Sequence, residues 1–97
     1  MIAEIQVSPR PAGTPDDRFH YVDAAIAIIA GSGLSYEVGA MGTTVEGSSD
    51  DVWALLRAVH EATIHAGAGA CLSVIKVASA SGDSGPTVSD LVDKHRQ

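Results

Sequence analysis

The chain has 97 residues, a formal net charge of −6 and 45% hydrophobic residues, of which few are aromatic. This length and composition predict one domain with an aliphatic core. The negative charge argues against a nucleic acid partner and against an anionic membrane surface, because both attract basic patches. No apolar run approaches the roughly 18 residues of a membrane span. We therefore expect a cytoplasmic protein.

The N-terminal third predicts a strand followed by a helix. Residues 2–8 alternate between apolar and polar side chains, as in a half-buried strand, and Pro9 is expected to end it. Residues 14–17 combine a capping threonine, a proline suited to the first helical position and two aspartates, so a helix is expected to begin there. Glycines at positions 31 and 33 are expected to end it. Its apolar stripe, at spacings of three and four, consists of Phe19, Val22, Ile26 and Ile29.

The middle of the chain predicts a β-hairpin and a second helix. Residues 34–39 and 43–47 form short alternating patterns joined by a turn at 40–42. Their core-facing side chains are expected to be Tyr36, Val38 and Val45. Residues 48–51 repeat the capping pattern of the first helix, and glycines at 67 and 69 mark its end. The second apolar stripe consists of Val52, Leu55, Leu56, Val59, Thr63 and Ala66.

The C-terminal third predicts the last and most apolar strand at residues 71–78, a loop at 79–86 and a short helix within 87–97. The order is βαββαβ. With right-handed crossovers it predicts an α+β ferredoxin-like sandwich, an antiparallel four-stranded sheet with two helices on one face. We expect one domain over residues 1–97, with its core at about 2–79.

Several residues resemble parts of known catalytic or metal sites but lack the required spacing. His60 and His65 are five residues apart, about 140° around a helix, whereas the zinc helix motif uses histidines four apart. We interpret them as a solvated helix rim. Cys71, the single cysteine, allows no intramolecular disulfide and lies in an apolar run that indicates a small buried side chain. Trp53 is expected to pack on the helix surface or at an interface. No metal or cofactor is expected.

The open face of the predicted sheet collects polar side chains. In this fold the first and third strands are central and the second lies beside the third, so Gln6, Glu37, Thr44 and Glu46 are expected to be neighbours. Carboxylates on one face repel one another unless they are hydrated, protonated or paired with a cation. Two interpretations stay open, a hydrated surface or a cleft for a cationic or amine-bearing ligand. Lys76 is a candidate partner for one carboxylate.

The predicted hairpin also resembles a known family. Residues 33–47 have the sequence GLSYEVGAMGTTVEG. This resembles the pattern G-L-x-Y-E-x-G-P-M-G-T-x-I/V-E-G of the small thiamine-binding ferredoxin-like proteins, long described as a domain of unknown function. The runs at 3–5 and 60–62 support the resemblance, and Ala40 replaces the expected proline. The resemblance covers residues 2–77 and leaves out the tail after Ser79.

The resemblance implies a non-enzymatic protein, commonly a dimer or tetramer, that binds thiamine or its hydroxymethylpyrimidine part. A carboxylate would accept a hydrogen bond from the pyrimidine amino group or offset the thiazolium charge. Threonine and glutamine side chains would complete the hydrogen bonds, and a methionine would lie against a ring face. The candidate ligand-binding residues are Gln6, Glu37, Met41, Thr43, Thr44 and Glu46.

Two other functions are weighed against thiamine binding. The first is a structural or regulatory homo-oligomer without a small-molecule ligand, in which the open face serves only assembly. The second is an enzyme of the acylphosphatase type, which needs an anion-binding loop with an arginine. Arg10 follows the first strand, but Pro9 and Pro11 beside it lack the N–H groups that cradle phosphate. An enzyme is therefore the least favoured function.

Overall fold

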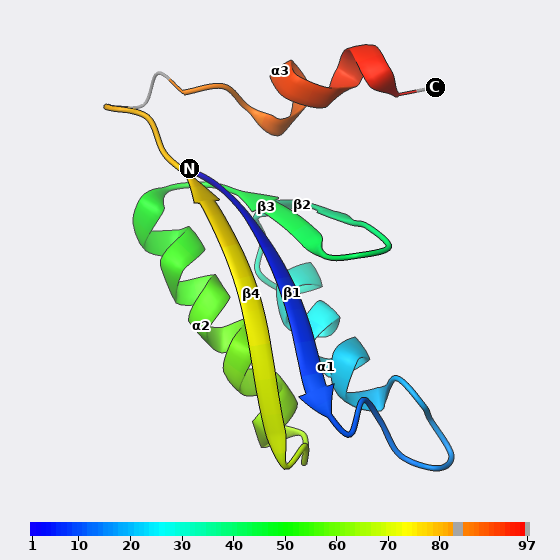
Figure 1. Ribbon diagram of the computed structural model, residues 1–97. Coiled ribbons are helices and arrows are strands. Elements are labelled where there is room, and N and C mark those ends of the chain that lie inside the picture. The colour runs from blue at the N-terminus through cyan, green and yellow to red at the C-terminus, as the bar shows by residue number, and fades with distance from the viewer. Residues whose placement is uncertain (83–84, 97) are drawn as a thin grey trace.

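The computed structural model describes residues 1–82 and 85–96 and confirms the βαββαβ order (Figure 1). A short C-terminal helix and one 3-10 turn follow the sixth element. The elements are β1 (Ile2–Arg10), α1 (His20–Ala30), β2 (Ser35–Val38), β3 (Thr43–Glu46), α2 (Ser49–His65), β4 (Ala70–Ala78), α3 (Val88–Val92) and η1 (Asp93–His95).

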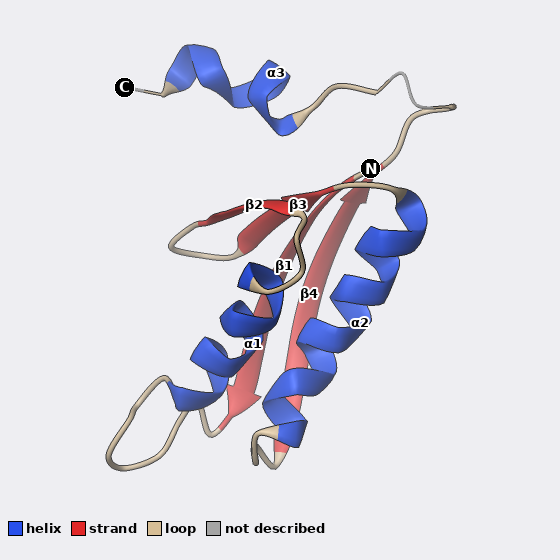
Figure 2. Cartoon of the chain, turned by 180° about the vertical axis from the view of Figure 1, so that it is seen from behind, coloured by secondary structure: helices blue, strands red, loops and turns tan. Residues whose placement is uncertain are grey.

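The four strands form one antiparallel sheet in the order β2-β3-β1-β4. Helices α1 and α2 lie side by side on one face of it (Figure 2). The C-terminal tail, described over residues 79–82 and 85–96, follows β4 and places α3 across the β2–β3 end of the sheet (Figure 1). The protein is thus the predicted α+β ferredoxin-like sandwich, with β1 and β3 in the centre.

The strand register decides which side chains share a face. Glu4 lies opposite Thr44 on one side and Lys76 on the other, and Glu37 also lies opposite Thr44. Residues directly opposite in an antiparallel pair point to the same face, so this row crosses the open face of the sheet. The next row, through Ala3 and Val45, points to the helices and is buried. The predicted alternation of β1 and β3 is confirmed.

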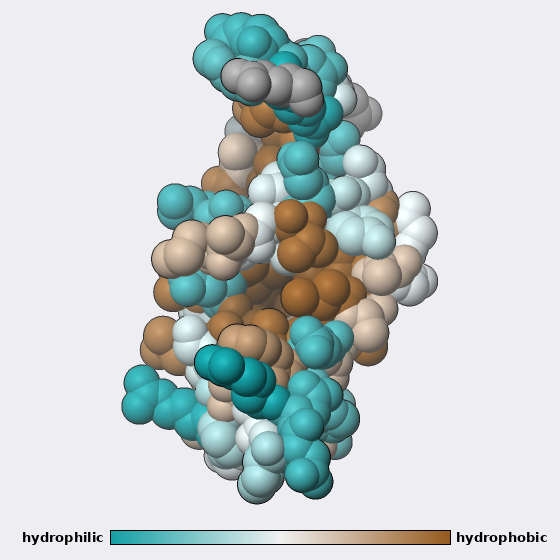
Figure 3. All heavy atoms as spheres, turned by 90° about the vertical axis from the view of Figure 1, so that its right-hand side faces the viewer, coloured by the Kyte–Doolittle hydropathy of each residue, from teal (hydrophilic) through white to brown (hydrophobic). Residues whose placement is uncertain are grey.

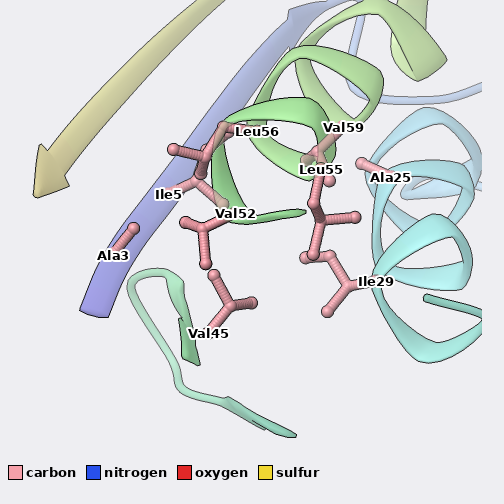
Figure 4. Packing of buried hydrophobic residues seen from close by; sticks show 9 residues of the cluster. All are labelled: Ala3, Ile5, Ala25, Ile29, Val45, Val52, Leu55, Leu56 and Val59. Atoms are coloured by element: carbon pink, nitrogen blue, oxygen red, sulfur yellow. The ribbon is translucent and has the colours of Figure 1, made fainter. Parts of the chain in front are cut away.

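The core lies between the sheet and the two helices and is wholly aliphatic, as the composition predicts (Figure 4). Its buried residues come from β1, β3, α1 and α2. They are Ala3, Ile5, Ala25, Ile29, Val45, Val52, Leu55, Leu56 and Val59. Strand β4 lies at the edge, and every one of its residues keeps at least intermediate exposure.

Helix α2 matches its prediction closely. The Ser48 side chain accepts a hydrogen bond from the Asp51 N–H at 3.2 Å, which satisfies one free donor of the first turn. At the other end Gly67 has φ +123°, a conformation that side-chain-bearing residues rarely adopt. The capping signals at both ends therefore predicted the bounds of α2 correctly.

Helix α1 begins at His20, so the predicted start at residues 14–17 is wrong. Thr14 does act as a cap, but of an isolated turn, because Asp17 N–H bonds its hydroxyl at 3.1 Å and its carbonyl oxygen at 3.2 Å. Such local side-chain bonds compete with helix formation. Phe19 consequently lies outside the apolar stripe, half exposed, with the Arg18 guanidinium 5.0 Å from its ring.

Two predictions about strands are also wrong. Tyr36 and Val38 point toward the helix side as expected, yet both are exposed, because β2 is an edge strand that α1 hardly covers. Strand β1 does not end at Pro9 but continues to Arg10. Beyond Ile5 it pairs only with β4, so its other side is a free edge where a residue without an N–H is tolerated.

Candidate functional site

Two hollows flank the β2–β3 hairpin and divide the six predicted ligand-binding residues between them. The first, here named the hairpin pocket, lies between the hairpin turn, α1 and β1. The second, the tail cleft, lies between β2, β3 and the C-terminal tail. The hairpin pocket contains Gln6, Met41 and Thr43, and the tail cleft contains Glu37, Thr44 and Glu46.

The sequence correctly placed the two carboxylates beside Thr44 but wrongly grouped Gln6 with them. The pairing of β1 with β3 ends at Ile5 and Thr43. Gln6 therefore lies one position past the end of β3 and has no directly opposite β3 residue. It belongs to the open-face row opposite Val74, and at this free edge of β1 it also borders the hairpin pocket. Alternation alone predicts the face of a residue, but not how far the neighbouring strand extends.

The hairpin pocket is a mainly apolar hollow of about 160 Å³. Its walls include Val22, Ile26 and Ile29 of α1 and Val7 of β1. Figure 3, which views the side toward which the hairpin points, shows brown side chains around a depression below the teal tail. A dry apolar cavity of about 150 Å³ can hold a benzene ring, so one aromatic ring fits this volume.

Two polar side chains of the hairpin pocket have no side-chain hydrogen-bond partner in the described part of the chain. In the described residues no side-chain hydrogen bond engages the Gln6 amide or the Thr43 hydroxyl, although Thr43 is only 5% exposed. Met41, at the turn, is 75% exposed. The residues that line the pocket thus combine apolar walls with an amide, a hydroxyl and an exposed thioether. These are the groups that orient a small ring with a polar edge.

Glycine allows the hairpin turn to lie close to β1. A Cβ on Gly42 would lie 3.2 Å from the Ile5 carbonyl oxygen and 3.2 Å from Cγ of Glu4. The turn itself is closed by a hydrogen bond from Gly39 N–H to the Gly42 carbonyl oxygen at 2.9 Å. Larger side chains at Gly42 would push the turn away from β1. The glycine at position 42 therefore has a steric reason, the close approach of the turn to β1.

The tail cleft is larger and polar, with a volume of about 410 Å³. Its two carboxylates are bound by the chain itself. Glu46 Oε2 accepts a hydrogen bond from the Val88 N–H at 2.8 Å, and Glu37 Oε2 accepts one from Arg96 Nη2 at 3.2 Å. Arg96 also donates to Asp93 at 2.7 Å. The expected repulsion between open-face carboxylates is therefore relieved by the protein's own tail.

A capping box fixes the start of α3 beside this cleft. The Thr87 hydroxyl accepts from Asp90 N–H at 3.1 Å, and the Asp90 carboxylate accepts from Thr87 N–H at 2.9 Å. The sequence predicted the short helix but not its contact with the sheet. On the same open face, Lys76 Nζ lies 3.9 Å from Glu4 Oε1, which answers the question of which carboxylate Lys76 faces.

The two histidines of α2 have different surroundings, because His60 contacts β4 whereas His65 is exposed. His60 Nδ1 lies 2.6 Å from Ser73 Oγ and links α2 to β4, so the predicted solvated rim is wrong for this residue. Beside it, a hydrogen bond from Arg57 at 2.9 Å holds the pKa of the Glu61 carboxyl below its usual range. Cys71 is partly exposed rather than buried, because β4 is an edge strand. Over the described ranges, no cluster of three metal-ligating side chains occurs.

Family comparison shows the family to which the chain belongs. The model of a family described as thiamine-binding protein matches residues 3–96. The chain belongs to the thiamine-binding protein family. The match runs through the tail, so the narrower range of 2–77 expected from the sequence was too short. A UPF0045 protein of Clostridium perfringens is 36% identical over 78 residues, which are 80% of each chain.

Solved structures of similar chains share the same fold. A Bacillus cereus protein of the DUF77 domain of unknown function is 33% identical, with a TM-score of 0.79 over 98% of this chain and 90% of its own. A Thermotoga maritima protein suggested to act in thiamine biosynthesis or salvage is 27% identical, with a TM-score of 0.79 over 98% and 97%. None of the described helices is long and apolar enough to cross a membrane.

Proposed function

We propose that this protein binds thiamine or its hydroxymethylpyrimidine part, without catalysing a reaction, and that the pyrimidine ring lies in the hairpin pocket. Family membership supports the class of ligand. The observation that carries the location is the pair of unengaged polar groups, Gln6 and Thr43, beside an apolar hollow of about 160 Å³. A cytoplasmic location stays a prediction from the sequence.

The chemistry of the ring matches these groups. An aminopyrimidine has two apolar faces and an edge that carries an amino donor next to a ring-nitrogen acceptor. The Gln6 amide offers one acceptor and two donors, and can therefore meet both edge groups at once. The thioether of Met41 can lie against a ring face when the exposed turn closes over the ligand. Thr43 supplies a further hydroxyl at the pocket wall.

The thiazolium charge of thiamine would gain little in this location. Among the described residues that line the hairpin pocket there is no carboxylate. The charged ring would therefore stay at the mouth, in water, where charge interactions are weak. It follows that hydroxymethylpyrimidine should bind nearly as tightly as thiamine, and that added salt should change the affinity little.

The tail cleft is the second candidate location. Glu37 and Glu46 could offset a cationic ring there, with Thr44 adding a hydrogen bond. A ligand would first have to displace Arg96 from Glu37. Binding in this cleft would favour thiamine strongly over the uncharged pyrimidine and would weaken with salt.

Calorimetry on the full chain tests both the function and the location. We expect heat and a thermal shift with thiamine and with hydroxymethylpyrimidine, at similar affinities in low and high salt. Absence of both signals at millimolar concentrations of both compounds would refute the function. A strong, salt-sensitive preference for thiamine would move the site to the tail cleft.

We further propose that the protein is a homo-oligomer. The observation in favour is a large group of exposed apolar side chains on and beside β4. Such an assembly is compatible with thiamine binding. It is also what a structural or regulatory oligomer without a ligand would require, and the calorimetric result separates these two functions.

A further inference from the structure

Strand β1 has a stretch of unpaired backbone beside the hairpin pocket. It pairs with β4 along Ile2–Arg10, but its pairing with β3 stops at Ile5 and Thr43. Figure 1 shows β1 and β4 continuing together beyond the β2–β3 hairpin. The next residues of β1 therefore have β4 on one side and no strand on the other. The first two of them, Gln6 and Val7, both border the hairpin pocket.

The hydrogen bonds of the sheet show which residue directs its backbone toward this free side. Met1 and Gly47 exchange two hydrogen bonds, of 3.0 and 3.1 Å, across the start of the β1–β3 pairing. In an antiparallel pair the residues that exchange bonds alternate with those that do not. Ala3, Ile5 and then Val7 consequently direct their N–H and C=O groups toward the β3 side. At Val7 the partner strand is no longer there.

Two further observations agree with this orientation. The carbonyl oxygen of Arg10, an even-numbered residue, accepts a hydrogen bond from Gly69 N–H at 3.0 Å, beside the start of β4. Pro9, which has no N–H, occupies the next odd-numbered position, where the ladder with β4 loses no bond. In the described part of the chain, no turn or loop residue bonds to the backbone of Val7. Val7 thus offers one N–H and one C=O, side by side, to a ligand in the pocket.

We infer that the backbone N–H and C=O of Val7 bind the polar edge of the pyrimidine ring and make the protein selective for 4-aminopyrimidines. This selectivity presupposes the proposed thiamine binding and rests on that proposal. On this edge of the ring the amino group lies next to a ring nitrogen. The Val7 C=O accepts one amino hydrogen and the Val7 N–H donates to the ring nitrogen, as the backbone of a neighbouring strand would. The second amino hydrogen is left for the Gln6 amide oxygen.

The backbone pair differs from the polar side chains of the pocket because its polarity is fixed. The Gln6 amide can rotate and exchange its oxygen with its nitrogen, and the Thr43 hydroxyl both donates and accepts. These two groups alone would therefore bind a ring with either an amino or an oxo substituent. The peptide groups of a strand cannot exchange donor and acceptor. A 4-oxo ring, which carries N–H beside C=O, would place donor against donor and acceptor against acceptor at Val7.

Thiamine and oxythiamine are matched ligands for a test on the full chain. They have the same charge and nearly the same shape, but oxythiamine carries a 4-oxo group in place of the amino group. Turning the ring over would restore its hydrogen bonds only by exchanging the small methyl group with the large thiazolium arm. Calorimetry should therefore show oxythiamine binding about a hundredfold or more weaker than thiamine. Equal affinities would overturn the selectivity alone, whereas no binding of either compound or of hydroxymethylpyrimidine would overturn the proposed function.

A substitution assigns the selectivity to Val7, which is needed because carboxylates in the tail cleft would also prefer an amino group. Val7→Pro removes the N–H that faces the pocket and leaves the ladder with β4 intact. Thiamine affinity should fall about tenfold, and the thiamine-to-oxythiamine ratio of affinities should fall by a similar factor, because one of the two clashes is gone. Val7→Ala also shortens the side chain but keeps the N–H, so it should keep the ratio. An unchanged ratio in Val7→Pro would overturn the assignment to Val7.

Hydrogen exchange on the unmodified protein tests the same contact without any change to the fold. The Val7 amide, which has no strand partner, should exchange about tenfold more slowly when thiamine is saturating. The Ser8 amide belongs to the ladder with β4 and is the internal control, with an exchange rate that should not change. A Val7 exchange rate that thiamine leaves unaltered would overturn the backbone contact, whatever the variants show.

Discussion

The two hollows beside the β2–β3 hairpin are lined by the same short strands but differ in which polar groups are available to bind a ligand. Thr43 and Thr44 are neighbours in β3, yet one lines the hairpin pocket and the other the tail cleft. The cleft holds the carboxylates, and the protein's own tail binds them. Among the described residues, the pocket lining holds no charged side chain, and its amide and hydroxyl have no side-chain hydrogen-bond partner. A group that already has a partner gains less from a ligand than a group without one, and for this reason we propose the pocket rather than the charged cleft as the binding site.

Filling the hairpin pocket should have the largest effect. Val22→Trp places a large ring into the space that the pyrimidine would use, and we expect affinity for thiamine to fall by more than about a hundredfold. Ile28→Trp, on the exposed side of the same helix, should bind normally. Calorimetry measures both. Unchanged binding by the Val22 variant would remove the pocket from consideration.

Removing the amide at the pocket should have the next largest effect. Gln6→Leu keeps the approximate size of the side chain but leaves the polar edge of the ring unpaired. A lost hydrogen bond of this kind costs about 1–2 kcal/mol, roughly a tenfold weaker affinity. Ser8→Ala, two residues along β1, is the control and should bind as the unmodified protein does. If Gln6→Leu binds equally well, the ring is oriented by other groups.

Neutralising the tail cleft should have little effect on binding. We expect Glu37→Gln combined with Glu46→Gln to change the affinity for thiamine by less than about twofold, because the hairpin pocket contains neither side chain. The titration should be repeated at two salt concentrations. A fall in thiamine affinity of tenfold or more, largest at low salt, would show that the tail cleft, not the hairpin pocket, is the binding site.

The smallest effect is expected from the tail itself. Arg96→Ala removes the exposed ion pair with Glu37, and such pairs contribute about 0–1 kcal/mol to the free energy of unfolding. Urea unfolding should therefore show a shift within this range, and Lys94→Ala should show none. Thiamine affinity should stay the same. A tighter affinity in the Arg96 variant would mean that the guanidinium competes with the ligand for Glu37.

Much of the fold could be predicted from local patterns. Alternation in residues 2–8 and 43–47, the Ser48 cap and the glycine at 67 each act over a few residues, and the structure confirms them. The errors lie where distant segments decide the outcome. Helix α1 begins later than predicted because Thr14 satisfies an isolated turn, and Tyr36 is exposed rather than buried because α1 hardly covers the edge strand β2.

For the candidate site, the sequence determined the residue types, their faces and the family resemblance, because alternation and motif spacing are properties of the chain alone. Only the tertiary structure decided their grouping. The pairing of β1 with β3 stops before Gln6, so this residue borders a pocket that α1 also lines. In the tail, Arg96 contacts Glu37 and Val88 contacts Glu46. The two tail contacts join residues more than forty positions apart, and no local pattern records which polar groups such distant contacts will leave free.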